Sequence, residues 1–249
     1  VSGRGELHLS ILIETMRREG YEFQVSRPQV IYKQIDGVLH EPMEHLTLDL
    51  PEEFQGGVIE LLGKKKAVMS GMTTDANGRV KLEFVVPARG LIGFRNIFLT
   101  ETKGEGIMHH NFHGYEPFRG EIPHRTQGAL ISMEDGVIVA YALFNLQDRG
   151  VMFVDPGDKV YTGMVIGEHS RDNDLDVNAC KTKKLTNMRA SGSDENIRLT
   201  PPIKMSLEQA IGWINDTELV ELTPKSIRLR KRYLDANERK KMDKMVAKA

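Results

Sequence analysis

Residues 45–63 read HLTLDLPEEFQGGVIELLG and change from a two-residue repeat to a helical repeat. Leu46, Leu48 and Leu50 alternate with polar residues, which is the pattern of a strand with one buried face. Pro51 then stands in the first turn of a segment whose apolar residues recur at helical spacing. The stretch therefore predicts a strand that leads directly into an amphipathic helix.

The residues that follow predict the rest of one folding unit. Strand patterns occur at 67–72 and 79–86, and the turn sequence DANG separates them at 75–78. A second helical face at 91–98 precedes a last strand at 105–112. The resulting order β-α-β-β-α-β is that of a split ferredoxin-like unit.

The two ends of the chain have a different pattern. An amphipathic helix is expected at 5–19, followed by a short strand. Beyond residue 117 we expect a mainly β domain, in which the apolar run 137–144 forms a strand buried on both faces. Residues 170–200 have the composition of a long flexible loop. Ser206 caps a short helix, and a strand pair and a basic helix finish an α+β protein.

The composition limits the cellular compartment and the class of partner that can be expected for this chain. The 249 residues carry a net charge of −1 and are 40% hydrophobic, and no apolar run is long enough for a membrane span. The single cysteine, Cys180, cannot form an internal disulfide, which favours the cytoplasm. From Lys225 to the end, ten basic residues stand against three acidic ones, a balance of +7 that points weakly to nucleic acid.

The sequence gives little support for catalysis. The nearest approach to a phosphate loop, at 57–65, is one residue too long and has Lys65 where Ser or Thr is needed. His109, His110 and His113 lack the Cys or carboxylate partners of a tetrahedral metal site, so a polar strand surface is the better interpretation. We therefore predict no catalytic residue, metal or cofactor in these residues.

Cationic segments are the better candidates for a site. The 181–189 segment contains four cations and no acid, although three aspartates just before it would repel phosphate, and a solvated loop is the alternative. Around 225–232, strand alternation places three arginines on one face. Two further exposed cations could extend such a surface. The predicted RNA-binding and ribosome-binding residues are Lys181, Lys183, Lys184, Asn187, Arg189, Lys204, Lys225, Arg228, Arg230, Arg232 and Arg79.

Several motifs resemble known translation factors. SGRGELHL at 2–9 and RPQVIY at 27–32 resemble the end of domain III of elongation factor G-like proteins, and PEEF at 51–54 opens the first helix of a unit similar to their domain V. PARGLIGFR at 87–95 and DLDVNACK at 174–181 resemble specifically the BipA/TypA translational GTPases. The resemblance covers essentially the whole chain.

The resemblance implies a division into domains. Residues 1–35 would be the C-terminal half of domain III, 36–116 domain V, and 117–249 the BipA-specific C-terminal domain. GTP and Mg²⁺ are expected only in a G domain absent from these residues. The family implies ribosome binding, roles in large-subunit assembly and stress adaptation, and contacts with rRNA, A-site tRNA, ribosomal proteins and the protein's own G domain, without a membrane.

A second hypothesis belongs to a different class. The chain could serve as a scaffold that docks on ribosomal proteins or on the G domain through apolar surface. Removal of RNA would abolish binding under the first hypothesis and spare it under the second.

Overall fold

The computed structural model describes residues 1–3, 5–122, 125–182 and 198–246. The chain forms two compact units, each assembled from separate segments. The first unit contains Val1–Glu6, Pro28–His124 and Ile211–Trp213, and the second contains Leu7–Arg27, Arg125–Ala210 and Ile214–Ala249. These two units are defined by packing, whereas the predicted domains are defined by resemblance to a family. The domain limits 1–35, 36–116 and 117–249 therefore stay a prediction.

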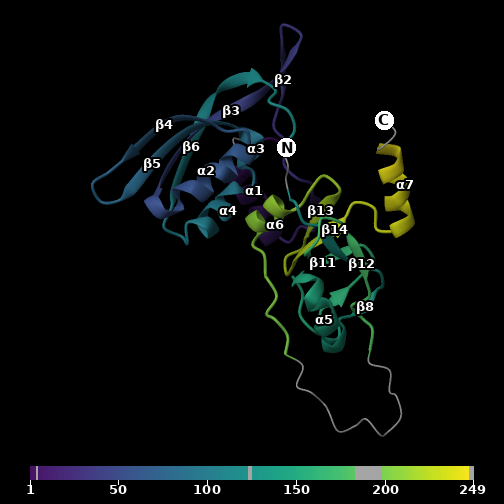
Figure 1. The fold of residues 1–249 in the computed structure, drawn as a ribbon. Coiled ribbons are helices and arrows are strands. Elements are labelled where there is room, and N and C mark those ends of the chain that lie inside the picture. Colours follow the sequence, from purple (N-terminus) through teal and green to yellow (C-terminus); the bar gives the residue numbers. More distant parts are fainter. Residues whose placement is uncertain (4, 123–124, 183–197, 247–249) are drawn as a thin grey trace. The chain divides into compact units, whose positions relative to one another are not determined.

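The first unit is built on a five-stranded antiparallel sheet (Figure 1). Its strands are β2 (Lys33–Ile35), β3 (Val38–Pro51), β4 (Val68–Thr74), β5 (Arg79–Pro87) and β6 (Ile107–Pro117). β3 lies between β5 and β6, β4 lies outside β5, and β2 forms a hairpin with the start of β3. Apart from this hairpin, the order β6-β3-β5-β4 is the one that a split ferredoxin-like unit requires, so the predicted fold is confirmed.

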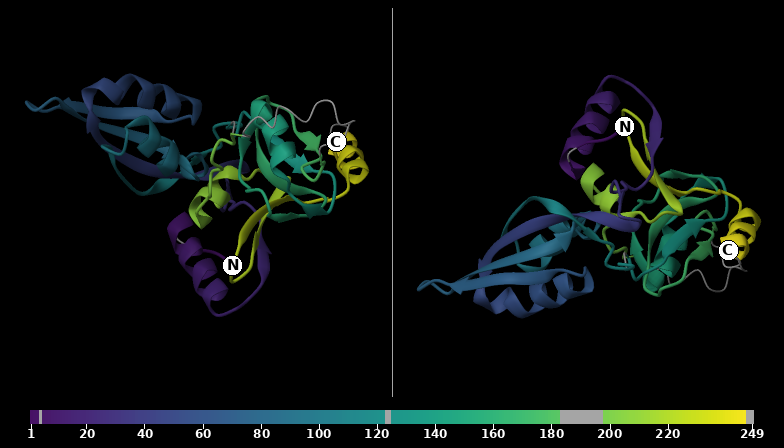
Figure 2. Two further views of the ribbon diagram at one scale, coloured as in Figure 1. Left: turned by 90° about the horizontal axis from the view of Figure 1, so that it is seen from below. Right: turned by 90° about the horizontal axis from the view of Figure 1, so that it is seen from above.

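Helices cover one face of that sheet, as Figures 1 and 2 both show. They are the 3₁₀ turn η1 (Glu52–Phe54), α2 (Gln55–Lys64), α3 (Ala88–Leu91) and α4 (Phe94–Glu101). The alternating leucines of β3 and the apolar positions of α2 and α4 share a single core. The side chains that alternate along the strand and those that recur at helical spacing thus pack together in one buried layer.

The second unit has a seven-stranded sheet. Its strands are β1 (Phe23–Val25), β7 (Ala129–Ser132), β9 (Gly150–Met152), β11 (Met164–His169), β12 (Leu175–Val177), β13 (Glu218–Leu222) and β14 (Ile227–Lys231). They follow the order β1-β13-β14-β11-β7-β12, and β9 also pairs with β11. β12 runs parallel to β7, and the other pairings in this sheet are antiparallel.

The second unit also contains short strands, a 3₁₀ turn and helices. They are β8 (Gly136–Val137), β10 (Lys159–Val160), the 3₁₀ turn η2 (Gln147–Arg149), and the helices α1 (Glu6–Arg18), α5 (Ala140–Leu146), α6 (Leu207–Trp213) and α7 (Ala236–Val246). Some residues at the ends of α1 and α6 group with the first unit. The predicted cap of α6 is confirmed, because the Ser206 hydroxyl accepts a hydrogen bond from the Gln209 amide in a capping box.

The predicted strand at 137–144 is wrong. Only Gly136–Val137 is a strand, and Ala140–Leu146 is the helix α5, with Ala142 and Leu143 buried. A short apolar run fits either a buried strand or a buried helix, and the helix-favouring alanines and leucines decide the case here. The predicted loop at 170–200 also contains β12, because Val177 and Ala179 belong to the core of this unit.

Candidate nucleic-acid interface

Arg79 is tied to the folded structure of the first unit. Its Nε donates to Asp49 Oδ1 at 2.6 Å, and its Nη2 lies 3.3 Å from the carbonyl oxygens of Asp49 and Glu105. The turn before it is fixed by Asp75, whose carboxylate accepts from the Arg79 and Asn77 amides. These backbone hydrogen bonds lower the pKa of Asp75. The charge of Arg79 is therefore largely balanced within this hairpin.

The arginines near the end of the chain follow the strand alternation that the sequence predicts. Arg228 and Arg230 lie on the partly exposed face of β14, whereas Leu229 and Lys231 are buried. Arg228 Nη1 is 3.5 Å from Glu221 Oε1. Arg230 donates to backbone carbonyl groups near the strand end. Arg232, just beyond the strand, is exposed and forms no ion pair with a described carboxylate.

Glu221 links this face of β14 to a buried tyrosine. The Tyr161 hydroxyl donates to Glu221, and burial together with this hydrogen bond raises the pKa of Tyr161 well above its usual value. The Glu221 carboxylate that Arg228 approaches is therefore already hydrogen-bonded to Tyr161. Part of the positive charge of Arg228 remains available to an anion.

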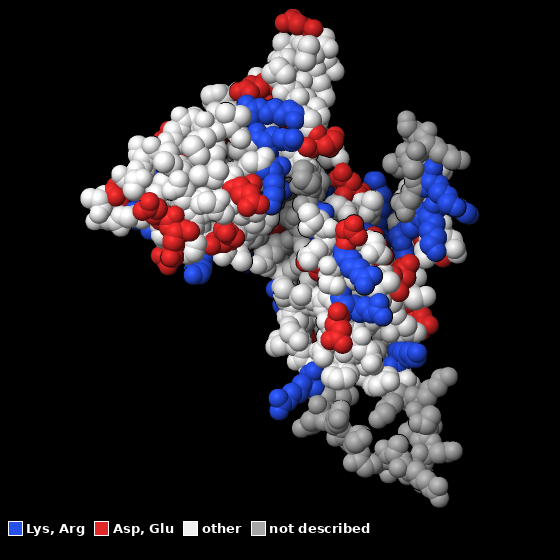
Figure 3. Space-filling model, in the orientation of Figure 1, with Lys and Arg blue, Asp and Glu red and all other residues white. Residues whose placement is uncertain are grey.

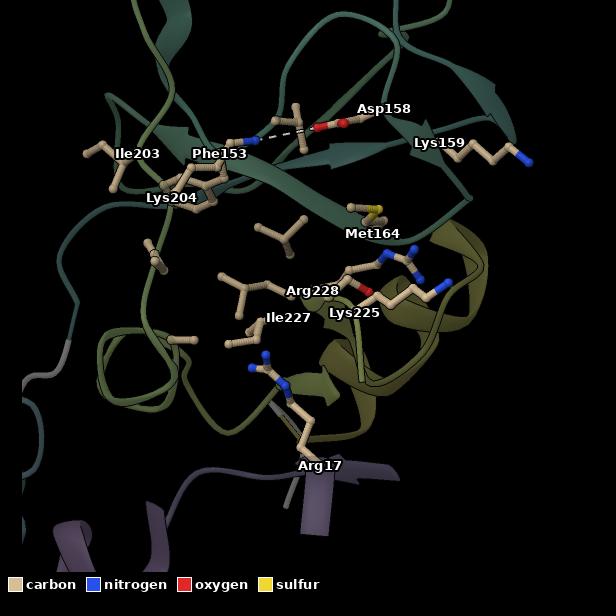
Figure 4. A pocket seen from close by; sticks show the side chains of 16 residues that line it. Arg17, Phe153, Asp158, Lys159, Met164, Ile203, Lys204, Lys225, Ile227 and Arg228 are labelled. Carbon is tan, nitrogen blue, oxygen red and sulfur yellow. Dashed lines mark ion pairs between the residues drawn. The ribbon is translucent and has the colours of Figure 1, made fainter. Parts of the chain in front are cut away.

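Lys204 and Lys225 differ in their pairing. Lys204 Nζ lies 2.7 Å from Asp155 Oδ2 and 3.6 Å from Asp158 Oδ2, whereas Lys225 is exposed in the β13–β14 turn without a described ion-pair partner. Both lysines line the same pocket as Arg228. The close-up in Figure 4 shows Lys225 and Arg228 extending beside each other along its rim. The fold thus brings three predicted residues together.

The remaining predicted residues belong to the 181–189 segment. Lys181 is exposed and follows Cys180 directly. Lys183, Lys184, Asn187 and Arg189 lie outside the described residues. Burial, followed by the nearby Glu134 and Asp135 carboxylates, raises the pKa of the Cys180 thiol. The thiol at the base of this segment is therefore held in its neutral form.

Two further groups of charged residues were not among the predicted site residues. The C-terminal helix α7 presents three exposed lysines, Lys240, Lys241 and Lys244, without a described ion-pair partner, and cationic side chains gather over it in Figure 3. Lys231 instead turns inward, is 2% exposed, and lies 2.7 Å from the buried Glu218. Strand alternation could have predicted this, because Lys231 is two residues from the apolar Leu229 and therefore lies on the same face of the strand.

The buried Glu218 is the centre of a charged cluster. Arg125 donates two parallel bonds to its carboxylate at 2.9 and 3.0 Å, and the Asn215 amide donates a third at 3.0 Å. Lys231 bridges Glu218 and Asp174, whose Oδ2 is 2.5 Å from Nζ. Two cations and two carboxylates balance each other, so this cluster stabilises the fold rather than attracting an anion.

The histidines of β6 remain apart from any cluster of metal-binding groups. In the described parts of the chain, no group of three or more His, Cys, Asp or Glu side chains could hold a metal ion. His110 Nδ1 is 3.2 Å from Glu44 Oε2, and His113 falls at a break in the register between β3 and β6.

No helix among the described residues is long and apolar enough to cross a membrane.

Comparison with known proteins places these features in a family. Residues 38–126 match the elongation factor G C-terminus, and residues 127–236 match the TypA/BipA C-terminal domain. The large ribosomal subunit assembly factor BipA of Salmonella typhimurium is 56% identical over 245 residues, 98% of this chain. The BipA proteins of Escherichia coli K12 and Synechocystis are 55% and 56% identical, over 98% and 93% of this chain.

The chain belongs to the TypA/BipA family. It spans about 40% of the length of these curated relatives. Most of the predicted cations lie within the range that matches the TypA/BipA C-terminal domain, whereas Arg79 lies in the range that matches elongation factor G. The three lysines of α7 follow the TypA/BipA match directly.

Proposed function

We propose that this chain is a ribosome-binding part of a large-subunit assembly factor and that it contacts rRNA through the cations of its second unit. The BipA relatives are named as assembly factors of the large ribosomal subunit, and RNA is the polyanion of that particle. The observation that carries the proposal is the set of exposed cations without described ion-pair partners in this unit. They are Arg149, Lys159, Arg171, Lys181, Arg198, Lys225, Arg232, Lys240, Lys241 and Lys244.

These cations suit phosphate contacts because, among the described residues, they have no carboxylate to release. A lysine that is already paired must lose its partner before it binds phosphate, whereas an unpaired lysine only displaces water and counterions. Within the predicted set, Lys181, Lys225 and Arg232 are therefore the strongest described candidates. Lys204, Arg228 and Arg79 would first have to be released from Asp155, Glu221 and Asp49.

The other predicted residues complete the proposal. Arg230 would act beside Arg228 on β14, and Lys183, Lys184, Asn187 and Arg189 of the 181–189 segment would add further contacts with RNA. A-site tRNA is the proposed further RNA partner of this segment. We propose that the chain binds without catalysing a reaction, and that GTP and Mg²⁺ are held by a G domain outside these residues. The cytoplasm is the proposed setting.

Sedimentation with purified large ribosomal subunits tests the proposal. We expect bound protein to fall steeply with KCl concentration, because phosphate neutralisation releases counterions. Replacing Lys240, Lys241 and Lys244 together with Gln should weaken binding and flatten the salt dependence. The matched Lys→Arg triple variant retains the charges and should bind like the unchanged chain. Binding that is indifferent to salt would refute the proposal.

A second candidate function, protein docking, has one observation in its favour. The β2–β3 hairpin and the two residues before it expose apolar side chains, including Ile31 at 64%, Val38 at 50% and Tyr32 at 41%. Figure 1 shows this hairpin extending beyond the rest of the sheet in the first unit. Such a surface suits a ribosomal protein or a G domain. Binding that survives nuclease treatment of the particle and is lost in Val38→Asp would favour this alternative.

A further inference from the structure

A pocket of about 490 Å³ opens in the second unit. Its floor consists of apolar side chains from two adjacent strands, including Met164 of β11 and Ile227 and Leu229 of β14. Ile203, which is 49% exposed, lies at its edge in Figure 4. This volume falls in the range of sites for small organic ligands, and it far exceeds the space of a few water molecules.

The rim of the pocket is strongly cationic. Five basic side chains line it, against the single carboxylate of Asp158. They are Arg17, Lys159, Lys204, Lys225 and Arg228. In Figure 4 Lys159, Lys225 and Arg228 lie on one side of the apolar floor, Lys204 lies above it and Arg17 lies below it. The pocket therefore combines an apolar surface with a surrounding positive field.

Ion pairs account for only part of this charge. Lys204 is paired with Asp155 and Asp158, Arg17 lies 3.3 Å from Glu14, and Arg228 lies 3.5 Å from Glu221. Lys159 and Lys225 are exposed and have no ion-pair partner among the described residues. Two positive charges are thus left for a ligand, one on the β10 side of the pocket and one on the β13–β14 turn.

The strand pairing excludes one class of ligand. An extended peptide commonly binds by adding to a free strand edge. β11 and β14 are paired with each other, and each also pairs with another strand on its other side. Leu229 lies between Val165 of β11 and Val220 of β13, so this part of the floor offers no free edge to a peptide backbone. A nucleotide base, in contrast, needs no strand edge, because it can lie with its face against apolar side chains while cations contact the flanking phosphates.

We propose that this pocket binds one unpaired nucleotide of an RNA strand. The base lies on the floor formed by Met164, Ile227 and Leu229, and the phosphates on either side of it contact Lys159 and Lys225. This inference rests on the proposed RNA-binding function and adds to it a site that selects single-stranded over double-stranded RNA. A base inside a duplex is stacked and paired, so it cannot enter.

The test measures fluorescence anisotropy of the full chain with a labelled single-stranded oligoribonucleotide and with its duplex. We expect tighter binding of the single strand. Ile203→Glu places a carboxylate at the pocket edge and should weaken single-strand binding by about tenfold, the effect of one lost stacked base. The matched control is Met133→Glu, because Met133 is 53% exposed, lies in the same unit and is not among the residues that line the pocket.

Lys225→Gln adds a charge-based readout. It should lower the slope of log affinity against log salt by about 0.7, the value for one phosphate contact of a single strand. If Ile203→Glu and Met133→Glu bind the oligonucleotide equally, or if the duplex binds as tightly as the single strand, the pocket proposal is wrong. Tighter binding of an acidic peptide that Ile203→Glu abolishes would also overturn it.

The pocket proposal and the broader function fail in different ways. A chain that sediments with large subunits in a salt-dependent manner but leaves the oligonucleotide unbound overturns the pocket proposal alone. A chain that binds neither the subunits nor the oligonucleotide overturns both.

Discussion

Replacing Glu218 with Gln should destabilise the second unit strongly. The change keeps the shape of the side chain but removes the charge that Arg125 and Lys231 share. Glu218 is fully buried and Lys231 is 2% exposed, so water cannot take over these contacts. Breaking a buried ion pair from one side costs about 3–5 kcal/mol. Asp174 remains beside Lys231, which places the expected loss near the lower limit, at about 3 kcal/mol.

Calorimetry gives the clearest measurement of this loss. For a protein of this size, 1 kcal/mol corresponds to about 2–4 °C, so the melting temperature of the second unit should fall by about 6–12 °C. The transition of the ferredoxin-like unit should stay in place, because no member of the cluster belongs to it. Circular dichroism below the transition checks that the variant is folded.

Two controls make this prediction specific. Lys231→Met should cost clearly less, because Glu218 then keeps both bonds from Arg125 and the bond from the Asn215 amide. Glu134→Gln, at an exposed acid of the same unit, should change stability by less than about 0.5 kcal/mol. The reasoning fails if Lys231→Met is as costly as Glu218→Gln, or if Glu218→Gln behaves like the surface control.

Three further predictions concern the capped helix and two titrating groups. Ser206→Ala should reduce stability by about 1 kcal/mol in urea unfolding, because the α6 cap is lost, while Ser206→Asp should retain it. The hydrogen bond from the Arg79 amide lowers the pKa of Asp75 below 3.8, so its stabilising effect is present above that pH and is lost as pH falls through the folded value. The stability difference between the unchanged chain and Asp75→Ala should therefore shrink in acid, and a constant difference would contradict the assignment. Burial and Glu221 raise the pKa of Tyr161 above 10.0, so Tyr161→Phe should remove only the most alkaline part of the tyrosine absorbance titration.

Periodicity predicted the first unit well because its elements each have one buried face. The leucines of β3 alternate and the apolar residues of α2 recur at helical spacing, so sequence and packing agree. The run at 137–144 failed because an uninterrupted apolar segment has no periodicity to separate strand from helix. Its length was compatible with both, and α5 forms there.

The candidate site was harder to predict because charge in a sequence does not reveal pairing. Arg79 and Lys204 look alike in sequence to Lys225, yet only Lys225 lacks a described ion-pair partner. The partners are distant along the chain, since Asp49 precedes Arg79 by 30 residues and Asp155 precedes Lys204 by 49. The pocket was missed for the same reason, since its floor and rim come together only when β11 and β14 pair.

The pairing of β1 with β13 has a consequence for how this protein is made. Phe23 lies opposite Leu222, so β1 leaves the translating ribosome about 200 residues before the strand that pairs with it. The sheet of the second unit therefore cannot be completed before β13 has been synthesised. A shortened version that starts at residue 127 would lack β1 and bare the backbone of β13, so attempts to isolate this unit should keep residues 7–27 joined to it through a linker.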